Sequence, residues 1–164
     1  PDNLAKLIGI LNKLVDKYNL PVIFSTHPRT KKQLDKLGLN LNPNIKFLKP
    51  FGFFDYIKLQ TESKCVLSDS GTITEESSIL NFPALNIREV HERPEGFEEA
   101  SVIMTGLSDD LVFQSLDLIE SQPRGKDRLL NIVNDYSSKN VSDKVIRIIL
   151  SYTDFVNRKV WRKQ

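Results

Sequence analysis

The residues best suited to chemistry in this sequence are concentrated in one stretch, Asp69–Glu76, which reads Asp-Ser-Gly-Thr-Ile-Thr-Glu-Glu. This stretch follows the short apolar run Cys65–Leu67, and a helical pattern begins at Thr72. A strand, a tight turn and a helix N-terminus together direct backbone N–H groups and a positive dipole at one place, which favours phosphate. The stretch therefore predicts a phosphate or nucleotide site, and an ordinary capped helix in an α/β domain is the alternative.

The two neighbouring carboxylates of this stretch are expected to have different tasks. Thr72 and Glu75 have the spacing of a capping box, in which the glutamate reaches back to the backbone N–H of the cap residue. Glu76 has no such task and lies one turn from the expected phosphate position. A carboxylate there could accept hydrogen bonds from the two hydroxyls of a ribose.

Short apolar runs that alternate with helical patterns indicate the elements that hold this stretch. A parallel sheet with helices on both faces is expected from such alternation. We expect one domain over residues 1–164, with a final amphipathic helix over about 141–161. The expected strands are residues 21–24, 45–48, 65–67, 84–87 and 101–104.

Most other candidate residues fall in loops at the carboxyl ends of these strands, where open parallel sheets bind ligands. The expected loops are residues 27–29, 50–52, 69–71 and 88–95, and they include both histidines, His27 and His91. This clustering at one rim supports a binding site more strongly than any single residue does.

Each remaining candidate also has a structural interpretation. His27 could bind phosphate or polarise a substrate, or simply satisfy the backbone of its loop, and Arg29 is either a phosphate ligand or a surface cation. Tyr56 could stack on a base or belong to the core. Arg93 suits a diphosphate through its bidentate guanidinium, or pairs with Glu95 to hold the loop.

Composition excludes several other classes of function. The formal net charge of +2 is too small to predict binding to nucleic acid or to an anionic membrane, and no apolar run approaches the roughly 20 residues of a membrane span. Cys65 is the only cysteine, which is typical of a reduced, cytoplasmic compartment. No spacing of His, Cys, Asp and Glu resembles a metal site, and no Walker, Gly-x-Gly-x-x-Gly or Gly-x-Ser-x-Gly motif is present.

Three of these loops, taken in order, resemble the C-terminal half of the non-hydrolysing UDP-N-acetylglucosamine 2-epimerase family. Asp69–Glu76 resembles the family's Asp-Ser-Gly-Gly-Ile-Gln-Glu-Glu, Glu92–Glu95 is its Glu-Arg-Pro-Glu, and Thr26–Arg29 resembles its first loop after a strand. The resemblance implies a Rossmann-like, doubly wound parallel sheet that forms the C-terminal domain of a two-domain fold of the glycosyltransferase-B type. UDP-sugar lies in the cleft between the two domains of that fold.

The resemblance also implies roles for individual residues. Ser70, Gly71 and Thr72 would contact the diphosphate, Glu76 would hold the ribose hydroxyls, and Tyr56 would lie beside the uridine. Thr72 departs from the family pattern, because it replaces a glycine that lets the backbone approach phosphate closely.

Other loop residues would lie farther from the nucleoside. Arg88, Arg93 and Glu95 would be on the sugar–diphosphate side. His27, with Arg29, lies near a histidine that helps some bacterial members to bind a second, regulatory UDP-sugar.

The mechanism implied by the resemblance is anti elimination of UDP to a 2-acetamidoglucal, followed by re-addition of UDP with inversion at C2. The family's acid–base groups come from its N-terminal domain and hinge, which would lie upstream of Pro1. We therefore expect the UDP-binding half of an active site, no catalytic residue in this chain, no cofactor, and an inactive isolated fragment. The missing N-terminal domain and a second copy, forming a homodimer at full length, are the expected partners.

The substrate pair stays open at this stage. The tail from Asn140 to Arg158 resembles a branch of the family from capsule and O-antigen clusters, which forms UDP-N-acetyl-L-fucosamine from its L-talosamine epimer. The alternatives to an epimerase are the C-terminal domain of a UDP-sugar-dependent glycosyltransferase and a non-catalytic nucleotide-binding module.

Overall fold

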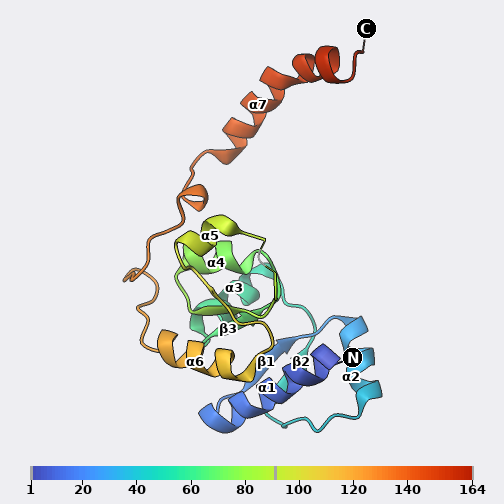
Figure 1. Cartoon of the computed structure of the whole chain (residues 1–164), viewed down its shortest axis with the longest axis vertical. Helices are drawn as coiled ribbons and strands as arrows, with labels where there is room; N and C mark the ends of the chain where they lie inside the picture. Colours follow the sequence, from blue (N-terminus) through green and yellow to red (C-terminus); the bar gives the residue numbers. More distant parts are fainter. Residues whose placement is uncertain (1, 91, 164) are drawn as a thin grey trace.

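The chain alternates helices and strands as its sequence predicts. The computed structural model describes residues 2–90 and 92–163 (Figure 1). The helices are α1 (Asp2–Tyr18), α2 (Pro28–Leu37), α3 (Phe53–Glu62), α4 (Ile73–Leu80), α5 (Pro94–Glu98), α6 (Asp109–Ile119) and α7 (Val141–Phe155). The strands are β1 (Val22–Ser25), β2 (Ile45–Leu48), β3 (Val66–Ser68), β4 (Ala84–Asn86) and β5 (Ile103–Met104). A 3₁₀ turn (Asn134–Tyr136) precedes α7, and a π-helical turn (Val156–Val160) extends it.

The five strands are all parallel but form two separate sheets. β1 pairs with β2 in register from Val22 opposite Ile45 to Ser25 opposite Leu48, and β3, β4 and β5 pair in that order. We expected one sheet, and no ladder joins β1 to β3 within the described residues. Apolar runs identify strands, but they do not specify which neighbour comes within the roughly 4.8 Å that pairing requires.

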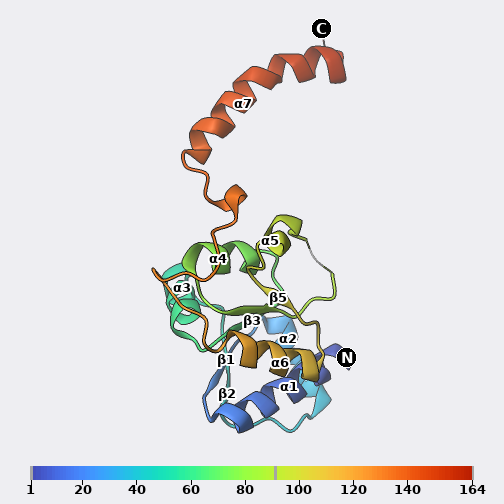
Figure 2. The same ribbon diagram turned by 60° about the vertical axis from the view of Figure 1, so that its left-hand side comes forward.

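One hydrophobic core nevertheless joins the two sheets. It contains apolar residues of α1 and α6 together with Phe24 and Phe47 from the first sheet and Leu67 and Leu85 from the second. Ion pairs between α1 and α6 cross its margin, with Lys17 Nζ 2.6 Å from the Asp117 carboxylate. The α/β architecture therefore depends on helices that cover both sheets (Figure 2).

The irregular segment that follows α6 is fastened to the end of α4. Asn81, in the left-handed conformation (φ 56°), ends α4, and its side-chain amide donates to the carbonyl of Asp127 at 2.7 Å. The Arg128 guanidinium donates to the carbonyls of Ser78 and Ile79 at 2.7 and 2.6 Å. The two Arg128 bonds satisfy carbonyls that the C-terminus of α4 leaves unpaired, so this part of the segment is held on the domain.

Helix α7 extends away from the rest of the chain in both views (Figures 1 and 2). None of its residues is buried, although Val145, Ile149 and Tyr152 lie at helical spacing and are 47–58% exposed. The expected final helix is present, but its apolar face is uncovered. No described helix is both long and apolar enough to cross a membrane.

Candidate functional site

The turn between β3 and α4 is built by side-chain hydroxyls. The N–H of Ser70 donates to Ser68 Oγ at 3.1 Å, and the N–H of Thr72 donates to Ser70 Oγ at 3.3 Å. The hydroxyls of Ser70 and Thr72 lie 3.0 Å apart, and both residues are exposed. Two hydroxyls are therefore presented to solvent directly before the first turn of α4.

The predicted capping box between Thr72 and Glu75 is wrong. Thr72 is in the right-handed helical conformation (φ −69°, ψ −12°) and its side chain makes no cap bond, whereas capping favours an extended residue. Its hydroxyl instead donates to Glu76 Oε1 at 2.9 Å. The Glu75 carboxylate accepts a hydrogen bond from Arg93 Nε at 2.8 Å, so Glu75 connects α4 to the Glu-Arg-Pro-Glu loop.

The Glu76 carboxylate is held at both oxygens. Oε1 accepts from Thr72, and Oε2 accepts from Nε2 of Gln60 at 2.5 Å. Gln60, on α3, is 2% exposed. Our sequence interpretation missed this contact; its only signal was a polar residue four positions after Tyr56 on an amphipathic helix.

Tyr56 belongs to the same cluster. It is half-buried on α3, one turn before Gln60. Burial raises the pKa of its hydroxyl most, the nearby carboxylates of Glu76 and Asp69 raise it further, and a hydrogen bond with Gln60 acts in the opposite direction. An aromatic ring, a fixed carboxylate and two exposed hydroxyls are thus gathered at the end of β3.

The loop after β4 approaches this turn at Gly71. A Cβ on Gly71 would lie 2.9 Å from Glu92 Oε2, so a larger residue there would push the end of the Glu92 side chain aside. Glu92 pairs with Arg88 across 2.6 Å. Their hydrogen bond lowers the pKa of the Glu92 carboxyl and raises the pKa of the Arg88 guanidinium. His91, expected on this loop, lies outside the described residues.

Arg93 and Glu95 each contact a residue outside their own loop. Arg93 binds Glu75, and Glu95 accepts a hydrogen bond from the hydroxyl of Tyr136 at 2.8 Å. Burial, followed by the bond to Glu95, raises the pKa of Tyr136. We did not single out Tyr136 from the sequence, because it lies in a polar segment without periodicity.

His27 and Arg29 lie at the start of α2 and are exposed. We expected a loop to Arg29, but α2 begins at Pro28, which suits a first helical position because its missing N–H leaves no donor unpaired. His27 Nδ1 accepts from the N–H of Arg29 at 3.3 Å. Within the described residues, no hydrogen bond or ion pair connects either side chain to the β3–α4 turn.

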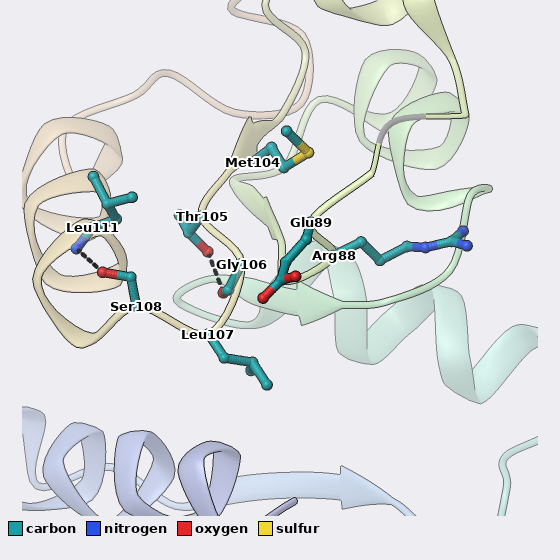
Figure 3. Close-up of a pocket in the computed structure, with 8 residues that line it drawn as sticks. All are labelled: Arg88, Glu89, Met104, Thr105, Gly106, Leu107, Ser108 and Leu111. Atoms are coloured by element: carbon teal, nitrogen blue, oxygen red, sulfur yellow. Dashed lines mark hydrogen bonds between the residues drawn. The ribbon is translucent and has the colours of Figure 1, made fainter. Parts of the chain in front are cut away.

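An open groove of about 370 Å³ lies at the ends of β4 and β5 and includes Arg88 (Figure 3). Its wall consists of Arg88, Glu89, Met104, Thr105, Gly106, Leu107, Ser108 and Leu111. Arg88 thus connects this groove with the loop that approaches Gly71. Among residues 2–90 and 92–163, no group of three or more His, Cys, Asp and Glu could hold a metal ion.

Comparison with known proteins gives a consistent result. Residues 1–150 match the family model described as UDP-N-acetylglucosamine 2-epimerase. A UDP-N-acetylglucosamine 2-epimerase of Campylobacter jejuni is 30% identical over 148 residues, which are 88% of this chain and 37% of that protein.

Solved structures agree in fold. The structure of UDP-N-acetylglucosamine 2-epimerase from Rickettsia bellii is 49% identical, with a TM-score of 0.90 over 99% of this chain and 45% of that one. A Methanocaldococcus jannaschii UDP-GlcNAc 2-epimerase, in complex with UDP-GlcNAc and UDP, is 26% identical with a TM-score of 0.78, over 91% of this chain and 41% of that one. The present chain therefore spans less than half the length of the relatives it matches.

Proposed function

Because the chain belongs to the UDP-N-acetylglucosamine 2-epimerase family, we propose that it forms the UDP-binding half of a UDP-N-acetylhexosamine 2-epimerase. The observation that carries this proposal is the carboxylate of Glu76, fixed by two donors beside the exposed hydroxyls of Ser70 and Thr72. These groups stand at the end of a parallel strand and the start of a helix, where nucleotides bind in open α/β sheets.

Each part of UDP has a chemically suited counterpart in this cluster. The hydroxyls of Ser70 and Thr72, the close approach permitted by Gly71 and the dipole of α4 suit the diphosphate. An ionised carboxylate can only accept hydrogen bonds, so Glu76 suits the two ribose hydroxyls. The half-buried ring of Tyr56 provides an apolar wall for uracil.

UDP is both the leaving group and the nucleophile of the proposed reaction. Elimination removes the proton from C2 and breaks the bond between C1 and UDP; re-addition restores that bond and returns a proton to the opposite face of C2. UDP must stay bound between the two steps, and holding it is the task we assign to this chain. Arg88, Arg93 and Glu95 would face the diphosphate and sugar, and the groove that includes Arg88 would adjoin the sugar. We propose that His27 and Arg29, which are exposed, belong to a phosphate or regulatory site separate from the UDP site at the β3–α4 turn.

The groups that move the C2 proton are assigned to the part of the longer protein that precedes this chain. The chain covers only 45% of the R. bellii structure that it matches with a TM-score of 0.90, so the longer protein would contain further residues that can cover α7. The uncovered apolar face of α7 would pack against the part that precedes this chain. We propose that the full-length protein is a cytoplasmic homodimer and that this chain alone is inactive.

For the substrate, we propose two alternative pairs of epimers. UDP-GlcNAc and UDP-ManNAc are one pair; UDP-L-TalNAc and UDP-L-FucNAc, suggested by the tail from Asn140 to Arg158, are the other. Either pair would supply precursors of surface polysaccharide.

Calorimetric titration of the chain with UDP, combined with a turnover assay on both pairs of UDP-sugars, tests this function. We expect weak, saturable binding of UDP and no epimerisation by the chain, whereas the full-length protein interconverts one pair. Absence of UDP binding would contradict the proposal. Transfer of the sugar to an acceptor by the full-length protein would indicate a glycosyltransferase instead.

A further inference from the structure

Gln60 is the buried residue of α3 that the proposed function does not yet use. Of the ten residues of this helix, all of which the structure describes, Gln60 alone is buried, and it is 2% exposed. A buried position on an amphipathic helix ordinarily holds an apolar side chain. The polar side chain at this position therefore requires a reason.

The contacts of the Gln60 amide supply that reason. Its Nε2 donates to Glu76 Oε2 at 2.5 Å, while its Oε1 is buried and has no hydrogen-bond partner in the described part of the chain. The opposite orientation of the amide would place an oxygen against a carboxylate, where neither group can donate. The amide is thus oriented to serve Glu76, and its own acceptor remains unsatisfied, which is unfavourable for folding.

We propose that Gln60 is a positioning residue, which holds the Glu76 carboxylate in the orientation that receives the hydroxyls of a ribose. Gln60, on α3, donates to one carboxylate oxygen of Glu76, and Thr72, in the β3–α4 turn, donates to the other. Glu76 is only half-buried, and without Gln60 its side chain could adopt other rotamers. Tyr56, one turn earlier on α3, is placed by the same helix, so α3 aligns the base side and the ribose side of the site together.

This inference rests on the proposed function, and a double-mutant cycle separates the two. The variants are Gln60→Met, which keeps the length of the side chain and removes the donor, Glu76→Ala, and the two combined. Gln33→Met, at an exposed position of α2, is the matched control. Each chain is titrated with UDP and with 2′,3′-dideoxy-UDP, and its melting temperature is measured.

We expect Gln60→Met to weaken UDP binding about three- to tenfold, which is the range for immobilising one flexible side chain. Binding of 2′,3′-dideoxy-UDP should be unchanged, and Gln60→Met should have no further effect once Glu76→Ala is present. The melting temperature should stay the same or rise, since a buried unpaired acceptor is removed. Gln33→Met should change neither property.

Two results would overturn the inference while the proposed function stands: unchanged UDP binding by Gln60→Met, or equal weakening of UDP and its dideoxy analogue. A lower melting temperature together with an additive effect in the double variant would show that Gln60 only supports the fold, which also overturns it. Failure of the parent chain to bind UDP would refute the proposed function, and this inference with it.

Discussion

The contact between Gly96 and Thr74 gives the sharpest prediction about how the Glu-Arg-Pro-Glu loop is held. Both residues are buried, and a Cβ on Gly96 would lie 2.0 Å from Thr74 Cγ2. The obstacle is a β-branched side chain that is 1% exposed and cannot swing aside. Gly96→Ala should therefore separate α5 from α4 and loosen the bonds of Arg93 and Glu95.

The expected loss follows from overpacking, which typically costs about 1–3 kcal/mol. Because 2.0 Å is far inside van der Waals contact, the cost at Gly96 should lie in the upper part of this range, at about 2–3 kcal/mol. Alanine favours a helix by about 1 kcal/mol over glycine, which leaves a net destabilisation of about 1–2 kcal/mol. At roughly 2–4 °C per kcal/mol for a chain of this size, the melting temperature should fall by about 2–8 °C. Urea unfolding followed by circular dichroism measures the free energy of unfolding, and thermal unfolding measures the melting temperature.

Gly9→Ala provides a matched control. Gly9 lies within α1 and has no atom within 4 Å of the position of an added Cβ, so the same substitution should stabilise the chain by up to about 1 kcal/mol. Adding Thr74→Ser to Gly96→Ala removes the clashing methyl group and should recover most of the loss. A Gly96→Ala chain as stable as the parent would refute the packing of α5 on α4 described above.

Two further substitutions and one alkylation experiment test separate features of the structure. Thr74→Val should leave stability unchanged or raise it by about 1 kcal/mol in urea unfolding, because Thr74 Oγ1 is buried without a partner in the described chain. Burial raises the pKa of the Cys65 thiol to about 12, so iodoacetamide should modify the native chain at pH 8 at least about a thousandfold more slowly than the unfolded chain. The folded chain holds the proton of this thiol more tightly than the unfolded chain does. The contribution of Cys65 to the free energy of unfolding is therefore complete below the unfolded pKa of about 8.5 and is lost as the pH rises toward 12. Ile149→Lys, on the exposed face of α7, should leave the melting temperature of this chain unchanged but lower that of the full-length protein; equal effects would contradict docking of α7.

The order and type of the elements could be predicted because their signals are local. Residues 45–48 were expected to form a strand and do, and the predicted final helix over about 141–161 is observed as Val141–Phe155 with a π-helical turn to Val160. The separation into two sheets could not be predicted, because the pairing of strands depends on neighbours distant in the sequence. Similarly, the uncovered face of α7 has the periodicity of an ordinary packed helix.

The site was predictable only where one loop carries the chemistry. The strand–turn–helix around Ser70 was expected from its residues alone and is observed. The task of Glu75 was predicted wrongly, since a capping box and a bond to Arg93 demand the same carboxylate and only the fold decides between them. Gln60 and Tyr136 were missed because each acts on a residue 16 or 41 positions away, and no local pattern records such contacts.

The most direct test of the central claim is calorimetric titration of the chain and its Glu76→Ala variant with UDP. Each hydrogen bond to a charged group contributes about 1.5–3 kcal/mol, so loss of the ribose acceptor should weaken UDP binding at least about tenfold. The melting temperature should fall by several degrees, because Glu76→Ala leaves the buried Gln60 amide without its hydrogen-bond acceptor. The dideoxy analogue, 2′,3′-dideoxy-UDP, should bind weakly to both chains with little difference between them. If the Glu76→Ala chain binds UDP as tightly as the parent does, Glu76 does not hold the ribose, and the assignment of the nucleotide site is contradicted.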